Sequence, residues 1–145
     1  MLQHIASDRG IRLFWDAECR ILLVRFNRGW NPAAYEPMVR RANALVQSQP
    51  GDVSVILYSR NSGLVPPVDI FDLGRKTIRQ VPANVRRVVI VDPRNSTRLL
   101  IKGFDRLLSF QGKGQAVQFF TANSISEAYS LLQGPPAAAA GGAAK

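Results

Sequence analysis

The sequence contains one cysteine and one histidine, and it has no long apolar segment. Cys19 alone cannot form an internal disulfide, and His4 has no evident partners for a histidine-based catalytic triad or a metal site. No apolar run approaches the roughly 18–20 residues of a membrane-spanning helix. Residues 1–10 also lack the apolar core of a signal peptide. We therefore expect a cytoplasmic, non-enzymatic protein with no cofactor and no metal.

Acidic residues are also few, with ten Asp and Glu against 19 Lys and Arg, so the net charge is +9. The excess is concentrated in residues 60–113, which carry 11 basic and 4 acidic side chains, a net charge of +7. A focused positive surface attracts phosphates, acidic protein faces or anionic lipid headgroups. The basic residues are mostly arginine, which suits bidentate contact with carboxylates and phosphates.

At 145 residues the chain is long enough for one domain with a real core and too short for two ordinary ones. Apolar runs predict five strands, over residues 11–15, 21–26, 53–58, 85–91 and 116–120. Amphipathic segments predict about four helices, between Asn31 and Pro50, over 70–80, after Ser96 and over 124–132.

The short polar connection between the first two strands predicts an N-terminal antiparallel hairpin. Helices separate the later strands, so right-handed crossovers should make those strands parallel. We therefore expect a single mixed, mainly parallel α/β sheet in the order β-β-α-β-α-β-α-β-α. The folded domain should span residues 11–134, between a mobile N-terminus (1–10) and a disordered Ala/Gly tail (135–145).

This order resembles the STAS domain (sulfate transporter and anti-sigma factor antagonist). The likeness is carried by the strand Val85–Val91 with its following helix, and by a terminal helix that begins Ser124-Ile-Ser-Glu-Ala. The resemblance implies a non-enzymatic regulatory domain that binds a protein partner, often under phosphorylation control. It also implies Ser62 as the phosphoacceptor, although no Asp precedes this serine and Leu64–Pro67 delays the next helix. The residues alone favour a simple turn at Asn61–Ser62–Gly63, a sequence chosen for its backbone geometry.

The first candidate site is a basic surface on the second and third predicted helices. It comprises Arg75, Lys76, Arg79, Arg98, Lys102 and Arg106. We expect this surface to dock on an acidic protein partner. A nucleic-acid accessory protein is the first alternative, because phosphates bind such a stripe. Single-strand binding also needs exposed aromatics, and most aromatics here, Phe14 among them, fall in strand or core positions.

The second candidate site lies where the parallel strands end, because ligands of open α/β sheets often bind there. The residues after the third and fourth predicted strands would form it: Arg60, Asp92, Arg94 and Ser96. Together they would offer guanidinium groups, a carboxylate and a helix N-terminus to a small anion or a lipid headgroup. This binder is the second alternative, and a half-covered sheet leaves a homodimer open.

Overall fold

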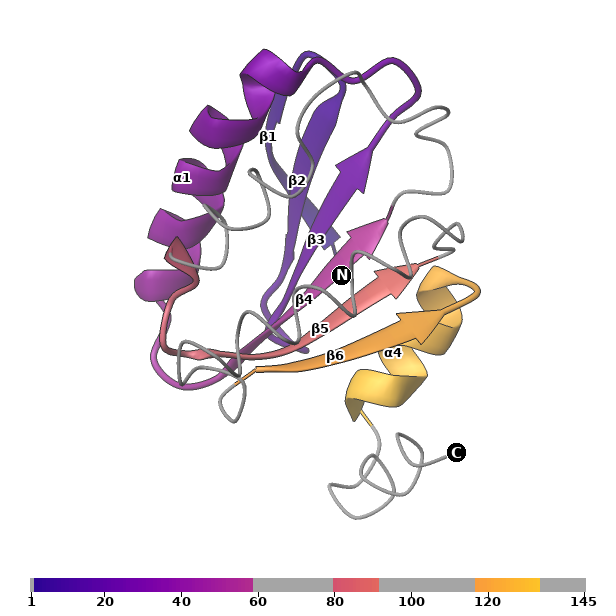
Figure 1. Cartoon of the computed structure of the whole chain (residues 1–145). Helices are drawn as coiled ribbons and strands as arrows, with labels where there is room; N and C mark the ends of the chain where they lie inside the picture. The colour runs from indigo at the N-terminus through magenta and orange to yellow at the C-terminus, as the bar shows by residue number, and fades with distance from the viewer. Residues whose placement is uncertain (1, 59–79, 92–116, 134–145) are drawn as a thin grey trace, which may run out of the picture.

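The computed structural model describes residues 2–58, 80–91 and 117–133, which form a mixed sheet of six strands with helices against it (Figure 1). The strands lie side by side in chain order. Their bounds are Leu2–Asp8 (β1), Ile11–Asp16 (β2), Ile21–Phe26 (β3), Val53–Tyr58 (β4), Val85–Val91 (β5) and Gln118–Ala122 (β6). β1, β2 and β3 pair antiparallel, and β3 to β6 pair parallel. The predicted α/β class and mixed sheet are confirmed.

The predicted number of strands is wrong, because residues 1–10, expected as a mobile terminus, contribute β1 to the sheet. The apolar pattern of this strand is weak for two reasons. β1 pairs only with β2, and Ala6 is its one buried residue. A register shift between His4 and Ala6 also interrupts the alternation. The last strand begins at Gln118, two residues later than predicted.

The described residues contain two α-helices rather than about four. α1 spans Tyr35–Gln47 after a short 3-10 turn at Pro32–Ala34, and α4 spans Ile125–Gln133. Of the predicted helix over 70–80 the structure describes only Gln80, which is helical. The predicted helix after Ser96 and the predicted tail, 135–145, lie outside the described residues. α4 begins as the sequence indicates, since Ser124 accepts a hydrogen bond from Glu127 N–H. Asn31 accepts one from Ala33 N–H and so caps the 3-10 turn, whereas α1 itself begins after Ala34 without a side-chain cap.

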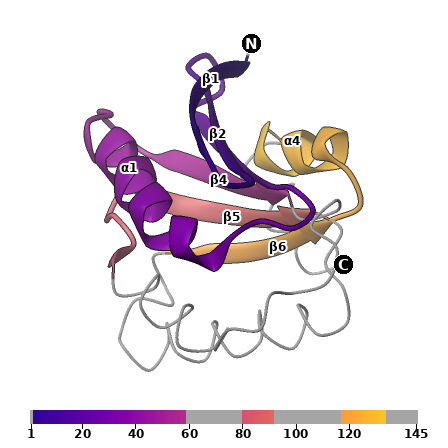
Figure 2. The same ribbon diagram turned by 90° about the horizontal axis from the view of Figure 1, so that it is seen from above.

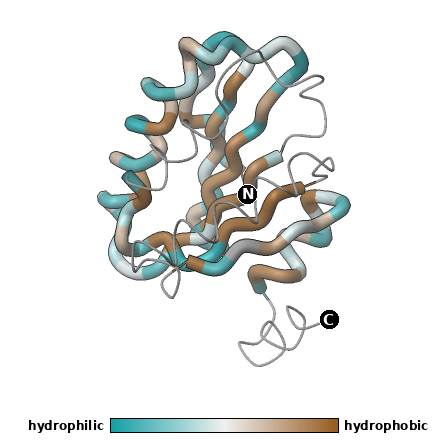
Figure 3. The backbone as a smooth tube through the Cα atoms, in the orientation of Figure 1, coloured by the Kyte–Doolittle hydropathy of each residue, from teal (hydrophilic) through white to brown (hydrophobic). Residues whose placement is uncertain are grey.

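The two helices cover opposite faces of the sheet (Figure 2). α1 buries Met38, Ala42 and Val46 against alternate strand residues such as Leu13 and Leu22. On the other face, α4 buries Ala128 and Leu132 in a second cluster, whose strand members are Ile21, Leu23, Ile56, Val89, Val91 and Ala122. Strands apolar on both sides therefore run through the middle of the fold, with hydrophilic residues on the outer side of α1 (Figure 3).

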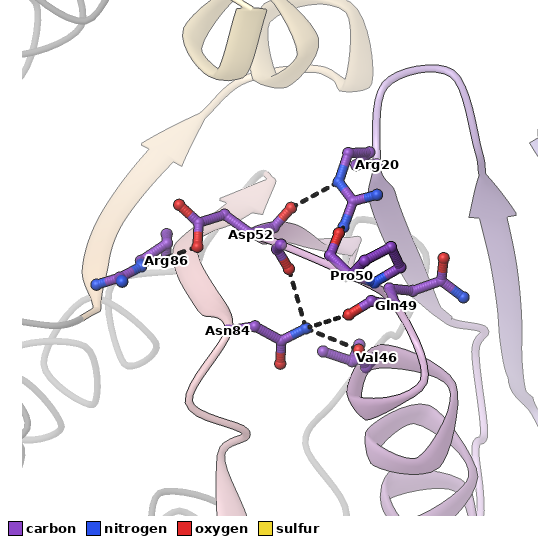
Figure 4. Close-up of polar contacts among 8 residues, drawn as sticks. Arg20, Val46, Gln49, Pro50, Asp52, Asn84 and Arg86 are labelled. Atoms are coloured by element: carbon purple, nitrogen blue, oxygen red, sulfur yellow. Dashed lines mark hydrogen bonds and ion pairs between the residues drawn. The ribbon is translucent and has the colours of Figure 1, made fainter.

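The turn between α1 and β4 is held by two side chains from elsewhere in the chain (Figure 4). Asn84 immediately precedes β5. Its side-chain amide donates to the carbonyl oxygens of Val46 (2.8 Å), Gln49 (3.4 Å) and Gly51 (3.2 Å). The Arg20 guanidinium, which precedes β3, donates to the carbonyl oxygens of Pro50 and Asp52 (2.9 Å). These bonds satisfy carbonyls of the turn that follows α1, and they tie this turn to the starts of β3 and β5.

Gly10 closes the hairpin between β1 and β2 at a point where no side chain fits. Its φ is +96°, and a Cβ there would lie 2.6 Å from Cα of Trp30. Gly29 has a φ of +75° but open space around its Cβ position, so it serves as the matched control.

We expect Gly29→Ala to lower the free energy of unfolding by ~1–2 kcal/mol, the strain of a left-handed backbone alone. Gly10→Ala should lower it by ~2–5 kcal/mol, because the Trp30 backbone must also move. Urea unfolding of both variants measures the difference. Equal losses would show that the contact with Trp30 does not constrain the hairpin.

Candidate functional site

None of the residues predicted to bind a partner or an anion is among the described residues. Three groups of predicted site residues lie outside the described ranges. They are the six basic residues of the predicted helices (Arg75, Lys76, Arg79, Arg98, Lys102 and Arg106), the predicted phosphoacceptor Ser62, and the anion-site residues Arg60, Asp92, Arg94 and Ser96. The structure does describe the strand ends from which the anion-site residues follow, at Tyr58 and Val91.

Strand pairing aligns a row of side chains at this carboxyl edge, on the face that α4 covers. The row runs across the sheet as Ser7, Arg12, Arg25, Tyr58, Val91 and Ala122. The next row on the same face, two residues back along each parallel strand, runs as His4, Phe14, Leu23, Ile56, Val89 and Phe120. The polar residues of both rows therefore lie on β1 to β4, whereas β5 and β6 contribute only the apolar side chains of Val89, Val91, Phe120 and Ala122.

Arg12 and Arg25 face each other directly across β2 and β3. Like charges in this position are destabilising. Within residues 2–58, 80–91 and 117–133, the ion pairs are Arg9–Asp8 (2.9 Å) and Arg86–Asp52 (3.2 Å), so no described carboxylate neutralises either arginine. The Nε of Arg25 is buried without a hydrogen-bond partner.

Aromatic rings lie beside both arginines. The Arg25 guanidinium carbon is 5.1 Å from the ring centre of Tyr58, and that of Arg12 is 6.0 Å from the ring centre of Phe14. The His4 ring meets Phe14 edge to face, with 5.4 Å between ring centres. We call these five residues, His4, Arg12, Phe14, Arg25 and Tyr58, the arginine–aromatic face.

The arginine–aromatic face is accessible along β1 and β2. His4 and Arg12 are exposed, whereas Phe14, Arg25 and Tyr58 are half-buried. α4 packs on β4, β5 and β6, and its Tyr129 reaches the far end of β2 at Asp16. Phe14 lies on a strand and packs against the cluster under α4, as predicted. Sequence analysis missed this face because it placed His4 in a mobile terminus and did not predict the register between the strands. The available signal was Arg25 and Tyr58 at the ends of two correctly predicted strands.

A second polar cluster joins α4 to the β2–β3 turn. The buried Asp16 carboxylate accepts hydrogen bonds from Cys19 N–H (3.1 Å) and from the Tyr129 hydroxyl (2.9 Å). Burial acts to raise the pKa of Asp16, but these bonds outweigh it and hold that pKa below its ordinary value. Burial and the Asp16 charge raise the pKa of the Cys19 thiol, whose sulfur accepts a hydrogen bond from Gln133 (2.7 Å). A thiol held protonated is a weak nucleophile, so this cluster fixes α4 rather than supplying chemistry.

We expect Tyr129→Phe to lower the free energy of unfolding at pH 7 by about 1.5–3 kcal/mol, because a buried carboxylate loses a hydrogen bond. A carboxylate with a lowered folded pKa stabilises the protein above its unfolded pKa, near 4, and this contribution disappears as the pH falls through the folded value. The loss caused by Tyr129→Phe should therefore shrink at acid pH.

Urea unfolding at pH 7 and pH 3 measures the effect of Tyr129→Phe. Tyr58→Phe is the control, because the contact of Tyr58 with the described residues is made by its ring, over which Arg25 lies, and its hydroxyl forms no hydrogen bond with any of them. An equal loss for Tyr129→Phe at both pH values would contradict a bond to an ionised Asp16.

An apolar cavity of about 170 Å³ lies on the opposite face, beside α1. Its lining includes Met38, Val55, Leu57, Val88 and Ile90 and carries no charged side chain. This composition suits an apolar group and not an anion. Among the described residues, no group of three or more His, Cys, Asp or Glu side chains could hold a metal ion. Neither α1 nor α4, the helices of the described ranges, has the length and hydropathy to cross a bilayer.

Comparisons of the chain with protein-family models, curated proteins and solved structures find no match. The resemblance to STAS domains therefore stays a prediction. Any functional conclusion has to come from the geometry of the arginine–aromatic face and from the charge of the chain.

Proposed function

We propose that this chain is a non-enzymatic binding module that docks an arginine-rich surface on an acidic partner macromolecule. The observation that carries the proposal is the direct opposition of Arg12 and Arg25, with no described carboxylate against either. An anionic partner would relieve their repulsion and accept charge-assisted hydrogen bonds from both guanidinium groups. The free protein would then tolerate a local instability that the complex removes.

The charge distribution supports this role. Residues 60–113 carry a net charge of +7, and Arg60 follows two residues after Tyr58, the last residue of β4. Partner binding by the six basic residues of the predicted helices, Arg75, Lys76, Arg79, Arg98, Lys102 and Arg106, belongs to the same proposal. So does a cytoplasmic location.

Regulation forms a further part of the proposal, because the STAS resemblance implies a phosphorylated serine in the loop after the third predicted strand. Ser62 lies four residues beyond Tyr58. A phosphate there adds a charge of about −1.5 to −2. That added negative charge would compete with an acidic partner for the arginines and lower the affinity of the module.

The test uses two labelled polyanions as probes, a 20-residue poly-glutamate peptide and a 20-nucleotide oligo(dT), and follows fluorescence anisotropy against the full chain. The site variant is Arg12→Gln/Arg25→Gln. The matched control is Arg40→Gln/Arg41→Gln, which removes the same charge from exposed positions on α1, the helix of the opposite face.

We expect the wild-type chain to bind at least one probe, with an affinity that falls as salt rises. The site variant should weaken binding about tenfold, the effect of about 1.4 kcal/mol, and the control by less than about threefold. If neither probe binds, or if both variants weaken binding equally, the opposed arginines are not the docking site.

A further inference from the structure

The carboxylates of an acidic partner would pair with the two guanidinium groups, but the site also holds aromatic rings. Arg12 and Arg25 each lie over an aromatic side chain, and His4 extends the ring system to the exposed edge strand β1. The register places the two arginines between Phe14 on β2 and Tyr58 on β4. Cations between two aromatic rings are the combination that binds phosphates and bases together.

The distance between the rings fits an extended ligand better than a single small anion. Phe14 and Tyr58 are two strands apart and one row apart on the same face. With strands about 4.8 Å apart and residues about 3.3 Å apart along each strand, the ring-bearing positions are separated by about 12 Å. One phosphate cannot reach both positions, whereas a chain of nucleotides can place bases at the rings and a phosphate at the arginines between them.

A single strand suits this arrangement better than a duplex does. In a duplex the faces of the bases are stacked on each other, so Phe14, Tyr58 and His4 would gain no contact with them. In a single strand the bases are free to stack on aromatic rings or on the flat guanidinium groups that already lie over them. We therefore expect this face of the sheet to bind unpaired nucleic acid more tightly than a duplex or a polyanion without bases.

We infer that the arginine–aromatic face binds single-stranded nucleic acid, with Arg12 and Arg25 on the phosphates and Tyr58, Phe14 and His4 stacking on bases. This inference rests on the proposed function and narrows its acidic partner to one class. A free phosphate and a poly-glutamate chain offer only anionic groups to the arginines, so loss of a ring should weaken the binding of a nucleic acid and not theirs.

The experiment compares labelled oligo(dT) of 20 nucleotides, a 20-base-pair hairpin duplex and poly-glutamate on the full chain. Tyr58→Leu removes a ring, and Tyr58→Phe retains it as the control. We expect oligo(dT) to bind about tenfold more tightly than the duplex. Tyr58→Leu should weaken oligo(dT) binding by about tenfold, within the range for loss of one stacked base, and Tyr58→Phe should leave it unchanged.

Salt dependence separates the two kinds of contact. Arg25→Gln should reduce the slope of log affinity against log salt by about 0.7, the value for one phosphate of a single strand. Tyr58→Leu should lower the affinity without changing that slope. If Tyr58→Leu proves unfolded in a thermal melt, His4→Ala takes its place, because an exposed ring can be removed without leaving a cavity. We then expect a loss of about fivefold.

The outcomes distinguish binding of single-stranded nucleic acid from docking on any acidic partner. Equal binding of the single strand, the duplex and poly-glutamate, with no effect of losing a ring, would overturn the inference and leave docking on an acidic partner standing. Binding of poly-glutamate alone would overturn it in favour of an acidic protein. Failure of all three probes to bind would overturn both the inference and the proposed function.

Discussion

The pairing register of the six strands is the constraint on which the other features depend. Side chains alternate between the two faces of a strand, so a shift of one residue in any pair would exchange its faces. Five consecutive pairings place Leu13 and Leu22 under α1 and Leu23, Ile56 and Val89 on the other face, where α4 packs. The same pairings bring Arg12 opposite Arg25. The register that builds both cores therefore also builds the charged site.

Two parts of this face have opposite character. Under α4, the Asp16 carboxylate is buried and satisfied by hydrogen bonds from Cys19 and Tyr129. At the other end of β2, Arg12 and Arg25 face each other without a described acid, and the Arg25 Nε has no partner. Proteins keep local conflicts of this kind chiefly at functional sites, where a ligand resolves them. The satisfied cluster around Asp16 therefore stabilises the fold, whereas the unsatisfied arginines are the part of this face that we expect to bind a partner.

The sequence predicted the elements well wherever the local signal was strong. The strands 21–26, 53–58 and 85–91 have their predicted bounds, and α4 begins at its predicted cap, Ser124. The predicted cap Asn31 instead starts the 3-10 turn that precedes α1. β1 was missed because an edge strand with one buried residue and a register shift lacks a clear alternation. The arginine–aromatic face was missed for another reason: its residues lie up to 54 positions apart in the chain, from His4 to Tyr58. Three successive strand pairings bring them together, and local patterns do not encode the register of these pairings.

The central claim is that Arg12 and Arg25 repel each other in the free protein. A double-mutant cycle on the free energy of unfolding, with Arg12→Gln, Arg25→Gln and both together at low salt, measures this coupling directly. We predict a destabilising interaction between the two arginines of about 0.2–1 kcal/mol, which decreases as salt is added. A coupling of zero, or one that stabilises the protein, would show that the pair is satisfied without a partner and would contradict the account.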